Sequence, residues 1–131
     1  MTQFMLDTNM VSYAIRGVES VVSRILATSP ADICISAISL AELRYGADRR
    51  ASKRLHRLID TILTSLTVVP FDAAAATRYG QVAASLSTMG VPIGFADTQI
   101  AAHALTMNMT LVTNNTKHFK RVRGLHIEDW S

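Results

Sequence analysis

The stretch Phe4-Met5-Leu6-Asp7-Thr8-Asn9 decides which fold the chain can adopt, because a short apolar run ends there in a carboxylate, a hydroxyl and an amide. Such a run predicts a short buried strand that is followed directly by polar side chains. In open α/β sheets, binding and catalytic sites lie outside the carboxyl ends of the strands. The stretch therefore predicts a functional site at Asp7, provided that other polar side chains reach the same edge of the sheet.

The composition is that of a globular protein with an apolar core. The chain has 131 residues, 49% of them hydrophobic, and a formal net charge of +3. This length suits one domain over residues 1–131, and the slight excess of basic residues is compatible with a polyanionic partner. The single cysteine, Cys34, cannot form a disulfide within the chain, which suits a reducing compartment. We find no signal-peptide pattern and no apolar run of roughly 20 residues, the length that spans a bilayer, so we expect a soluble cytoplasmic protein.

Apolar segments of two kinds alternate along the chain. Short apolar runs predict strands over residues 4–6, 33–35, 68–71, 111–113 and 125–127. Segments with helical spacing lie between them, and the clearest one, over about residues 52–66, carries a continuous apolar stripe. Strands that alternate with helices imply crossover connections and parallel pairing. The sequence thus predicts the α/β class: one three-layer α/β/α domain with a mainly parallel sheet of four to five strands.

Three more polar residues are expected beside Asp7. Glu42 lies one to two turns into the helix after the second strand, Asp97 begins a later helix, and Asn115 follows the fourth strand. Carboxylates that converge at one edge of a sheet repel one another unless a cation lies between them. Oxygen ligands select hard ions such as Mg²⁺ or Mn²⁺, and such an ion can activate water and neutralise the charge that develops on a phosphodiester.

Each of these four residues also has a purely structural interpretation. Asp7, Asp97 and Asn115 could each cap the helix that follows it. Ser39 and Glu42 have the spacing of a capping box, in which Glu42 would bond back to the Ser39 N–H. Four capping coincidences at one edge of a sheet are less expected than one shared site, and capping does not exclude ligation.

Four segments together resemble a known family. Residues 5–9 (MLDTN), 38–46 (ISLAELRYG) and 93–104 (IGFADTQIAAHA) resemble the PIN-domain family. The ending, from residues 111–115 (LVTNN) to residues 128–130 (EDW), is similar to the VapC toxins of bacterial toxin–antitoxin pairs. The resemblance extends over essentially the whole chain.

This resemblance implies an activity, a cofactor and partners. VapC-like toxins are Mg²⁺-dependent endoribonucleases, with Mn²⁺ as a possible substitute, that cut structured RNAs such as tRNA or rRNA. A VapB-like antitoxin inhibits them, a homodimer is expected, and operator DNA would be contacted only through the antitoxin. Asp7, Glu42 and Asp97 match the three acidic metal ligands of the family. Many relatives have an aspartate at the position of Asn115, so a second metal ion would bind more weakly here, although the amide carbonyl can still ligate.

The resemblance also implies supporting roles and a mechanism. Asn9 matches an amide behind the metal ligands, and Thr113 matches a hydroxyl that supports the site. We interpret the hydroxyls of Thr8, Ser39 and Thr113 as hydrogen-bond donors. A metal-activated water would attack the scissile phosphate, and no residue is an obvious covalent nucleophile. His103 lies six residues after Asp97, which is not a same-face spacing in a helix, so we interpret it as a packed histidine rather than an acid–base group.

Basic and apolar residues predict contact surfaces. Lys117, Lys120 and Arg121 belong to a dense basic segment directly after Asn115, so we expect them to contact the RNA backbone. A second basic group is explained equally well by solvation and by contact with phosphate or antitoxin: Arg49, Arg50, Lys53, Arg54 and Arg57. Four residues near the N-terminus are candidates for a groove that receives an antitoxin helix, although core packing explains them equally well: Val11, Tyr13, Ala14 and Ile15.

Two other classes of function remain open at this point. A non-catalytic RNA- or partner-binding module on the same fold would explain Asn115 in place of an acid. A phosphatase of the haloacid-dehalogenase type also has an aspartate after its first strand. That class needs a second aspartate two residues later, where this chain has Asn9, so it fits the sequence least well.

Overall fold

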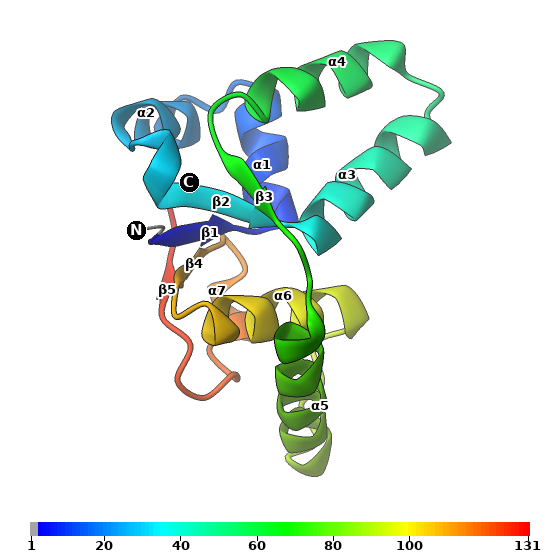
Figure 1. Ribbon diagram of the computed structural model, residues 1–131, viewed down its shortest axis with the longest axis vertical. Coiled ribbons are helices and arrows are strands. Elements are labelled where there is room, and N and C mark those ends of the chain that lie inside the picture. Colours follow the sequence, from blue (N-terminus) through cyan, green and yellow to red (C-terminus); the bar gives the residue numbers. More distant parts are fainter. Residues whose placement is uncertain (1–2) are drawn as a thin grey trace.

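The computed structural model describes residues 3–131, which contain a five-stranded parallel sheet (Figure 1). The strands follow the order β3-β2-β1-β4-β5, and each neighbouring pair is parallel. Their bounds are β1 (Phe4–Leu6), β2 (Ile33–Ser36), β3 (Thr67–Val69), β4 (Thr110–Val112) and β5 (Ile127–Glu128). The predicted parallel sheet is confirmed, and β3 lies at an edge, where Pro70 removes no ladder hydrogen bond.

Helices cover both faces of this sheet. The helical elements are α1 (Thr8–Ile15), α2 (Glu19–Ala27), the short 3₁₀ helix η1 (Pro30–Asp32), α3 (Ala37–Arg49), α4 (Lys53–Ile62), α5 (Ala73–Thr88), α6 (Phe95–Thr106) and α7 (Thr116–Phe119). Figure 1 shows α1 to α4 on one side of the sheet and α5 to α7 on the other, so the predicted three layers are confirmed. Within the described chain, no helix has the length and apolarity to cross a membrane.

Neighbouring residues of β1 supply the two halves of the core. Leu6 packs with the α1–α4 layer, whereas Met5 packs with α5 and α6. Both side chains are fully buried, as the central strand of a parallel sheet requires, because helices cover both of its faces. This two-sided burial fixes the strand ends in space, and the strand ends carry the polar residues.

Caps and turns set the helix boundaries. Ser36 caps α3, since its Oγ accepts a hydrogen bond from the Ile38 N–H at 3.1 Å. The capping box that was the structural alternative for Ser39 and Glu42 therefore does not begin α3, and Ser39 lies buried inside this helix. Helix α4 ends at Ile62, earlier than predicted, because the next residues form turns that bring Leu66 into the core.

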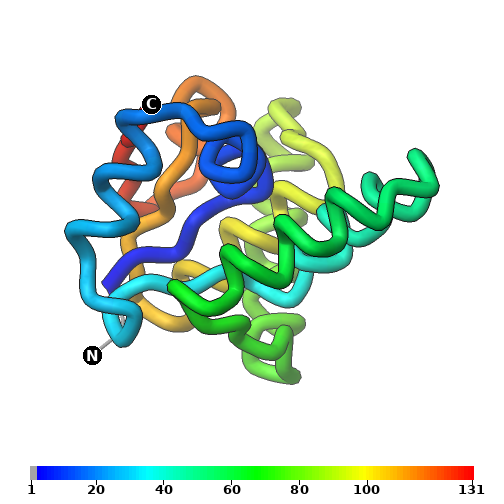
Figure 2. The backbone as a smooth tube through the Cα atoms, turned by 90° about the horizontal axis from the view of Figure 1, so that it is seen from above, coloured from blue at the N-terminus to red at the C-terminus, as the bar shows by residue number. Residues whose placement is uncertain are grey.

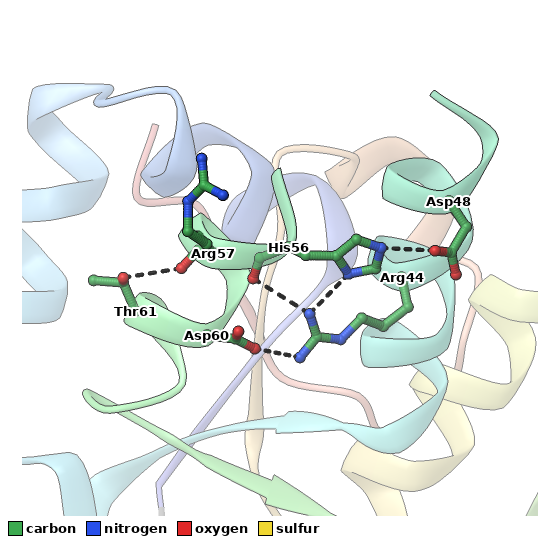
Figure 3. Close-up of polar contacts among 6 residues, drawn as sticks. All are labelled: Arg44, Asp48, His56, Arg57, Asp60 and Thr61. Atoms are coloured by element: carbon green, nitrogen blue, oxygen red, sulfur yellow. Dashed lines mark hydrogen bonds and ion pairs between the residues drawn. The ribbon is translucent and has the colours of Figure 1, made fainter. Parts of the chain in front are cut away.

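Helices α3 and α4 form an antiparallel pair that projects from the sheet, as the view from above shows (Figure 2). Arg44 of α3 joins them, as Figure 3 shows: its Nη2 donates to Asp60 Oδ1 at 2.6 Å, and its Nη1 lies 3.0 Å from His56 Nδ1. The opposite ring nitrogen of His56 lies 2.7 Å from Asp48 Oδ1. Exposed ion pairs of this kind stabilise little, so their main effect is to set how α4 lies over α3.

Candidate active site

Asp7 lies directly after β1 and is held by groups from two other elements. Its Oδ1 accepts a hydrogen bond from the Met10 N–H at 2.9 Å, which caps α1. Its Oδ2 accepts a hydrogen bond from Thr113 Oγ1, after β4, at 2.6 Å. The side chain is only 4% exposed. A carboxylate with both oxygens held in this way has a fixed position at the carboxyl edge of the sheet.

Burial and neighbouring charges determine the ionisation of Asp7. Burial raises the pKa of Asp7 to about 6, and the hydrogen bonds from Thr113 and Met10 lower it in part. The negative charges of Asp97 and Glu42 raise this pKa further. Asp97 and Glu42 therefore lie close enough to Asp7 for their charges to act on it, and Glu42 also acts on Asp97.

Glu42 reaches the site from α3. Its Oε1 accepts a hydrogen bond from Thr8 Oγ1, the first residue of α1, at 2.5 Å. Glu42 is exposed, so this bond from a neighbouring helix is what directs its carboxylate towards the sheet edge.

Asp97 is the third residue of α6 and does not cap it. The N-cap is Gly94, whose φ of 98° favours glycine, and no side-chain cap is formed. Burial raises the pKa of Asp97, the charge of Glu42 raises it further, and His118 lowers it. Among the contacts of residues 3–131, the Asp97 carboxylate accepts no hydrogen bond, so both of its oxygens are available to a ligand.

Asn115 joins the site through its backbone and turns its side chain to His118. The Asn115 N–H donates to Thr113 Oγ1 at 2.9 Å, and Asn115 Nδ2 lies 2.9 Å from His118 Nδ1. Asn115 is the N-cap residue of α7 by position, without a side-chain capping bond. His118 was not predicted as a site residue, although it lies three residues after Asn115, a spacing at which side chains meet on one helix face.

Two predicted supporting residues do not contact the acids. Asn9 is exposed and takes no part in the hydrogen bonds of Asp7 within the described chain. Ser39 is fully buried, and its Oγ has no hydrogen-bond partner among the described residues. The supporting hydrogen bonds come from two hydroxyls: Thr113 donates to Asp7 and Thr8 donates to Glu42.

His103 is a packed histidine, as predicted. It is 1% exposed, its Nδ1 lies 2.8 Å from Ser36 Oγ, and its ring meets the Phe71 ring edge-on at 5.3 Å. Burial lowers the pKa of His103, while the charge of Asp72 opposes that shift. An enclosed imidazole at this place supports the packing of α6 on β2 rather than proton transfer at Asp97.

A groove of about 370 Å³ opens beside Glu42, between α1, α3 and α4. Its lining combines polar residues with an apolar floor: Thr8, Asn9, Ser12, Ile15, Arg16, Glu42, Leu43, Gly46, Ala47, Arg50, Leu55 and Ile59. Of the four candidates for an antitoxin groove, only Ile15 lines it. Val11 and Ala14 are buried in the core, and the Tyr13 hydroxyl accepts a hydrogen bond from Asn114 at 2.7 Å.

The predicted basic residues surround the end of α7. Lys117 and Lys120 are exposed, whereas Arg121 is half-buried and its Nη1 lies 3.5 Å from the Pro92 carbonyl oxygen. Helix α7 begins directly after Asn115. The three residues thus belong to the same short segment as His118, which starts beside Asn115.

The acids supply oxygen donors but no ready-made metal cage. Within residues 3–131, no group of three or more Asp, Glu, His or Cys side chains is arranged so that it could hold a metal ion. Mg²⁺ commonly keeps several waters and takes one or two protein carboxylates. The free carboxylate of Asp97 and the like charges of Asp7 and Glu42 form an oxygen-only donor set of that kind.

The family follows from a direct comparison. The family model described as "PIN domain" matches residues 4–125. The chain belongs to the PIN-domain family. The match includes β1 to β4, all the helices and the three acids Asp7, Glu42 and Asp97.

Relatives within the family are VapC proteins. The chain is 40% identical to the tRNA(fMet)-specific endonuclease VapC of Shigella flexneri, with 100% of both chains covered. It is 39% identical to ribonuclease VapC2 of Rickettsia felis, with 97% of both covered. This PIN-domain chain is therefore of the VapC ribonuclease type.

Solved structures agree with this placement. The crystal structure of DNA-bound VapBC from Salmonella typhimurium contains a chain that superimposes with a TM-score of 0.94 at 38% identity, with 100% of both chains covered. VapBC2 from Rickettsia felis, bound to a DNA fragment from its promoter, gives a TM-score of 0.91 at 37% identity and covers 99% of this chain and 100% of that one. The fold of this PIN-domain chain is thus the fold of VapC chains in those complexes.

Proposed function

We propose that the chain is a Mg²⁺-dependent endoribonuclease and the toxin component of a type II toxin–antitoxin pair. The observation that carries this proposal is that three carboxylates, those of Asp7, Glu42 and Asp97, lie close enough for their charges to act on one another. Such an arrangement of like charges is unfavourable by itself and becomes favourable around a cation. VapC relatives supply the reaction class, which is cleavage of RNA.

Each acid has its own part in this proposal. Asp7 is the fixed ligand, because Thr113 and Met10 hold both of its oxygens. Asp97 is the ligand that is free to bind directly, and Glu42 acts directly or through water. A bound Mg²⁺, or Mn²⁺ in its place, would supply an activated water and would neutralise the charge that develops on the scissile phosphate.

Structured RNA is the proposed substrate, with tRNA ahead of rRNA. The relatives from Shigella flexneri and Salmonella typhimurium are named tRNA(fMet)-specific endonucleases, so initiator tRNA is the first RNA to test. Lys117, Lys120 and Arg121 lie on the flank of the acids, where they would contact the RNA backbone. A cytoplasmic location follows from that substrate.

A VapB-like antitoxin is the proposed protein partner. The solved relatives are VapBC complexes, some of them bound to DNA. The groove between α1, α3 and α4 would receive an antitoxin segment, because an apolar floor and two arginines, Arg16 and Arg50, lie next to Glu42. We further propose a homodimer that contacts operator DNA only through the antitoxin.

The test is cleavage of total cellular RNA and of an initiator tRNA transcript. The wild type should cut in Mg²⁺ and lose activity in EDTA, and Asp97→Asn should be inactive in both. Glu19→Gln, which removes an exposed carboxylate of α2 away from the site, is the matched control and should remain active. Cleavage by the wild type in EDTA, or by Asp97→Asn in Mg²⁺, would contradict the proposal.

A non-catalytic RNA-binding module is the second candidate. Asn115 favours it, since an amide that is engaged with His118 stands where many relatives have an acid. This candidate expects tRNA binding that EDTA leaves unchanged, without new RNA ends in Mg²⁺. Mapping the RNA ends in the same reactions therefore decides between the two functions.

A further inference from the structure

A second hollow, of about 170 Å³, lies on the other side of the sheet from the groove. It lies between α5 and the segment that follows α7, both in the lower layer of Figure 1. Three arginines line it: Arg78 from α5, and Arg121 and Arg123 from the segment after α7. Three cationic side chains from two separate elements thus meet around one small space.

These arginines are not explained by ion pairing within the described chain. Of the residues that line the hollow, none is acidic, and no ion pair of residues 3–131 includes Arg78, Arg121 or Arg123. By contrast, Arg24 and Arg44, which tie elements together, donate to Glu128 and Asp60 at 2.8 and 2.6 Å. Like charges that converge without a counter-ion leave a positive potential, and an anion would relieve it.

The base of the hollow is rigid and apolar. Val82 and Leu86 of α5 and Val122 of the facing segment are buried in the same core cluster. Gln81 and Ser85 add polar groups next to the arginines. Guanidinium groups above a packed floor suit a phosphate, because each planar guanidinium can donate two hydrogen bonds to the phosphate oxygens.

Arg121 connects this hollow to the proposed cleavage site. It belongs to the segment that begins at Asn115 beside the acids, and its Nη1 approaches the carbonyl oxygen of Pro92. The loop that contains Pro92 leads directly to α6 and Asp97. An RNA strand with one phosphate at the acids can therefore continue across this loop towards the hollow.

We propose that the hollow formed by Arg78, Arg121 and Arg123 binds a backbone phosphate of the RNA substrate away from the phosphate that is cut. This inference rests on the proposed ribonuclease function, and it extends the RNA contact from α7 to α5. Backbone phosphates carry no sequence information, so the site contributes affinity and orientation rather than base recognition.

The experiment measures tRNA binding rather than cleavage. Fluorescence anisotropy with labelled initiator tRNA in EDTA reports affinity over a range of salt concentrations for the wild type and for Arg78→Gln/Arg123→Gln. Each lost phosphate contact should lower the slope of log affinity against log salt by about one, so the double variant should lose up to about two. Reversal of charge in Arg78→Glu/Arg123→Glu should weaken binding more than the glutamine pair does.

Matched controls separate this inference from a general loss of charge. Arg24→Gln/Arg44→Gln removes the same charge from α2 and α3 in the opposite layer, where both arginines form ion pairs, and should change the slope less. An equal loss in that control, or an unchanged slope in both hollow variants, would overturn the inference. So would unchanged tRNA binding combined with weaker binding of the antitoxin, because the hollow would then serve a protein partner.

The result is independent of the cleavage test. If the wild type binds tRNA without cutting it, the ribonuclease proposal fails while the slope still decides the role of the hollow. If the wild type cuts tRNA, and the hollow variants show the same slope of log affinity against log salt as the control variant, only the further inference fails. Thermal unfolding of each variant shows whether the chain is folded, so that a smaller slope of log affinity against log salt is not mistaken for the effect of unfolding.

Discussion

Thr113 Oγ1 donates a 2.6 Å hydrogen bond to Asp7 Oδ2, so the residue after β4 holds the carboxylate that follows β1. The same hydroxyl oxygen accepts the Asn115 N–H at 2.9 Å. One side chain therefore fixes both the central acid and the start of the segment that leads into α7. The bond also lowers the pKa of Asp7 and so opposes part of the effect of burial.

Removal of this hydroxyl should impair both stability and activity. In Thr113→Val, Asp7 loses a donor to its ionised form, so its pKa should rise above the present value of about 6. The Asn115 N–H also loses its acceptor, and we expect a loss of about 1–2 kcal/mol in the free energy of unfolding. Urea unfolding and cleavage rates between pH 5 and 8 provide the measurements, and the acid limb of the rate profile should move to higher pH.

Thr113→Ser is the matched control for that change. It keeps the hydroxyl and removes only a methyl group from a fully buried position. The acid limb of its rate profile should stay near that of the wild type. A valine variant with the wild-type profile would show that Thr113 acts through packing alone.

Asp7→Asn should abolish cleavage and yet stabilise the metal-free chain at neutral pH. The ordinary pKa of an aspartate is 3.8, whereas the pKa of Asp7 in the folded chain is about 6, so the folded chain holds this proton more tightly than the unfolded chain does. The contribution of Asp7 to stability is therefore most favourable at pH below about 4 and decreases as pH rises to about 6. Two pKa units correspond to about 3 kcal/mol, which is an upper bound for the gain in Asp7→Asn at pH 7.5.

The asparagine variant retains one of the two hydrogen bonds in an unchanged form. Its amide oxygen can still accept from the Met10 N–H, so α1 keeps its cap. Thermal unfolding in EDTA at pH 4.5 and 7.5 gives the measurement, and the advantage of Asp7→Asn should appear only at the higher pH. A variant less stable than the wild type at pH 7.5 would mean that the ionised carboxylate is stabilising in the fold.

Mg²⁺ should make the wild type more stable than Asp7→Asn at pH 7.5, the opposite of the order expected without metal. A cation binds the ionised form of Asp7, so it should raise the unfolding temperature of the wild type at pH 7.5 and far less at pH 5. Asp7→Asn should respond weakly at both values, whereas Glu19→Gln should respond as the wild type does. Equal stabilisation of Asp7→Asn and the wild type by Mg²⁺ would place the ion elsewhere.

The sequence predicted the sheet and the three acids for the same reason. Apolar runs mark the strands, and a parallel order brings Asp7, which follows β1, to the same edge as the starts of α3 and α6, the helices that carry Glu42 and Asp97. It could not decide which of two serines caps α3, because Ser36 and Ser39 both satisfy the preference and only the length of β2 selects Ser36. It predicted Thr8 as a hydrogen-bond donor, and Thr8 donates to Glu42, whereas Asn9 makes no hydrogen bond to the acids within residues 3–131.

Two glycines in helices offer a test of the groove between α1, α3 and α4. A Cβ added at Gly46 of α3 or at Gly80 of α5 would meet no atom within 4 Å, and neither residue has a positive φ. Alanine at either position should therefore stabilise the chain by roughly 0.5–1 kcal/mol, mainly because the unfolded chain loses freedom. Thermal unfolding of both variants measures this gain, and a loss at either position would contradict the space found there.

Larger side chains at the same two positions should show whether the antitoxin binds in the groove, because only one of the two positions lines it. Gly46 lines the groove and Gly80 does not, so leucine at position 46 should hinder an antitoxin segment that lies there. We expect Gly46→Leu to cut tRNA and to need at least tenfold more antitoxin for half inhibition, which corresponds to about 1.4 kcal/mol of binding free energy. Gly80→Leu should be inhibited as the wild type is. Inhibition of Gly46→Leu at the wild-type antitoxin concentration would show that the antitoxin segment does not enter the groove.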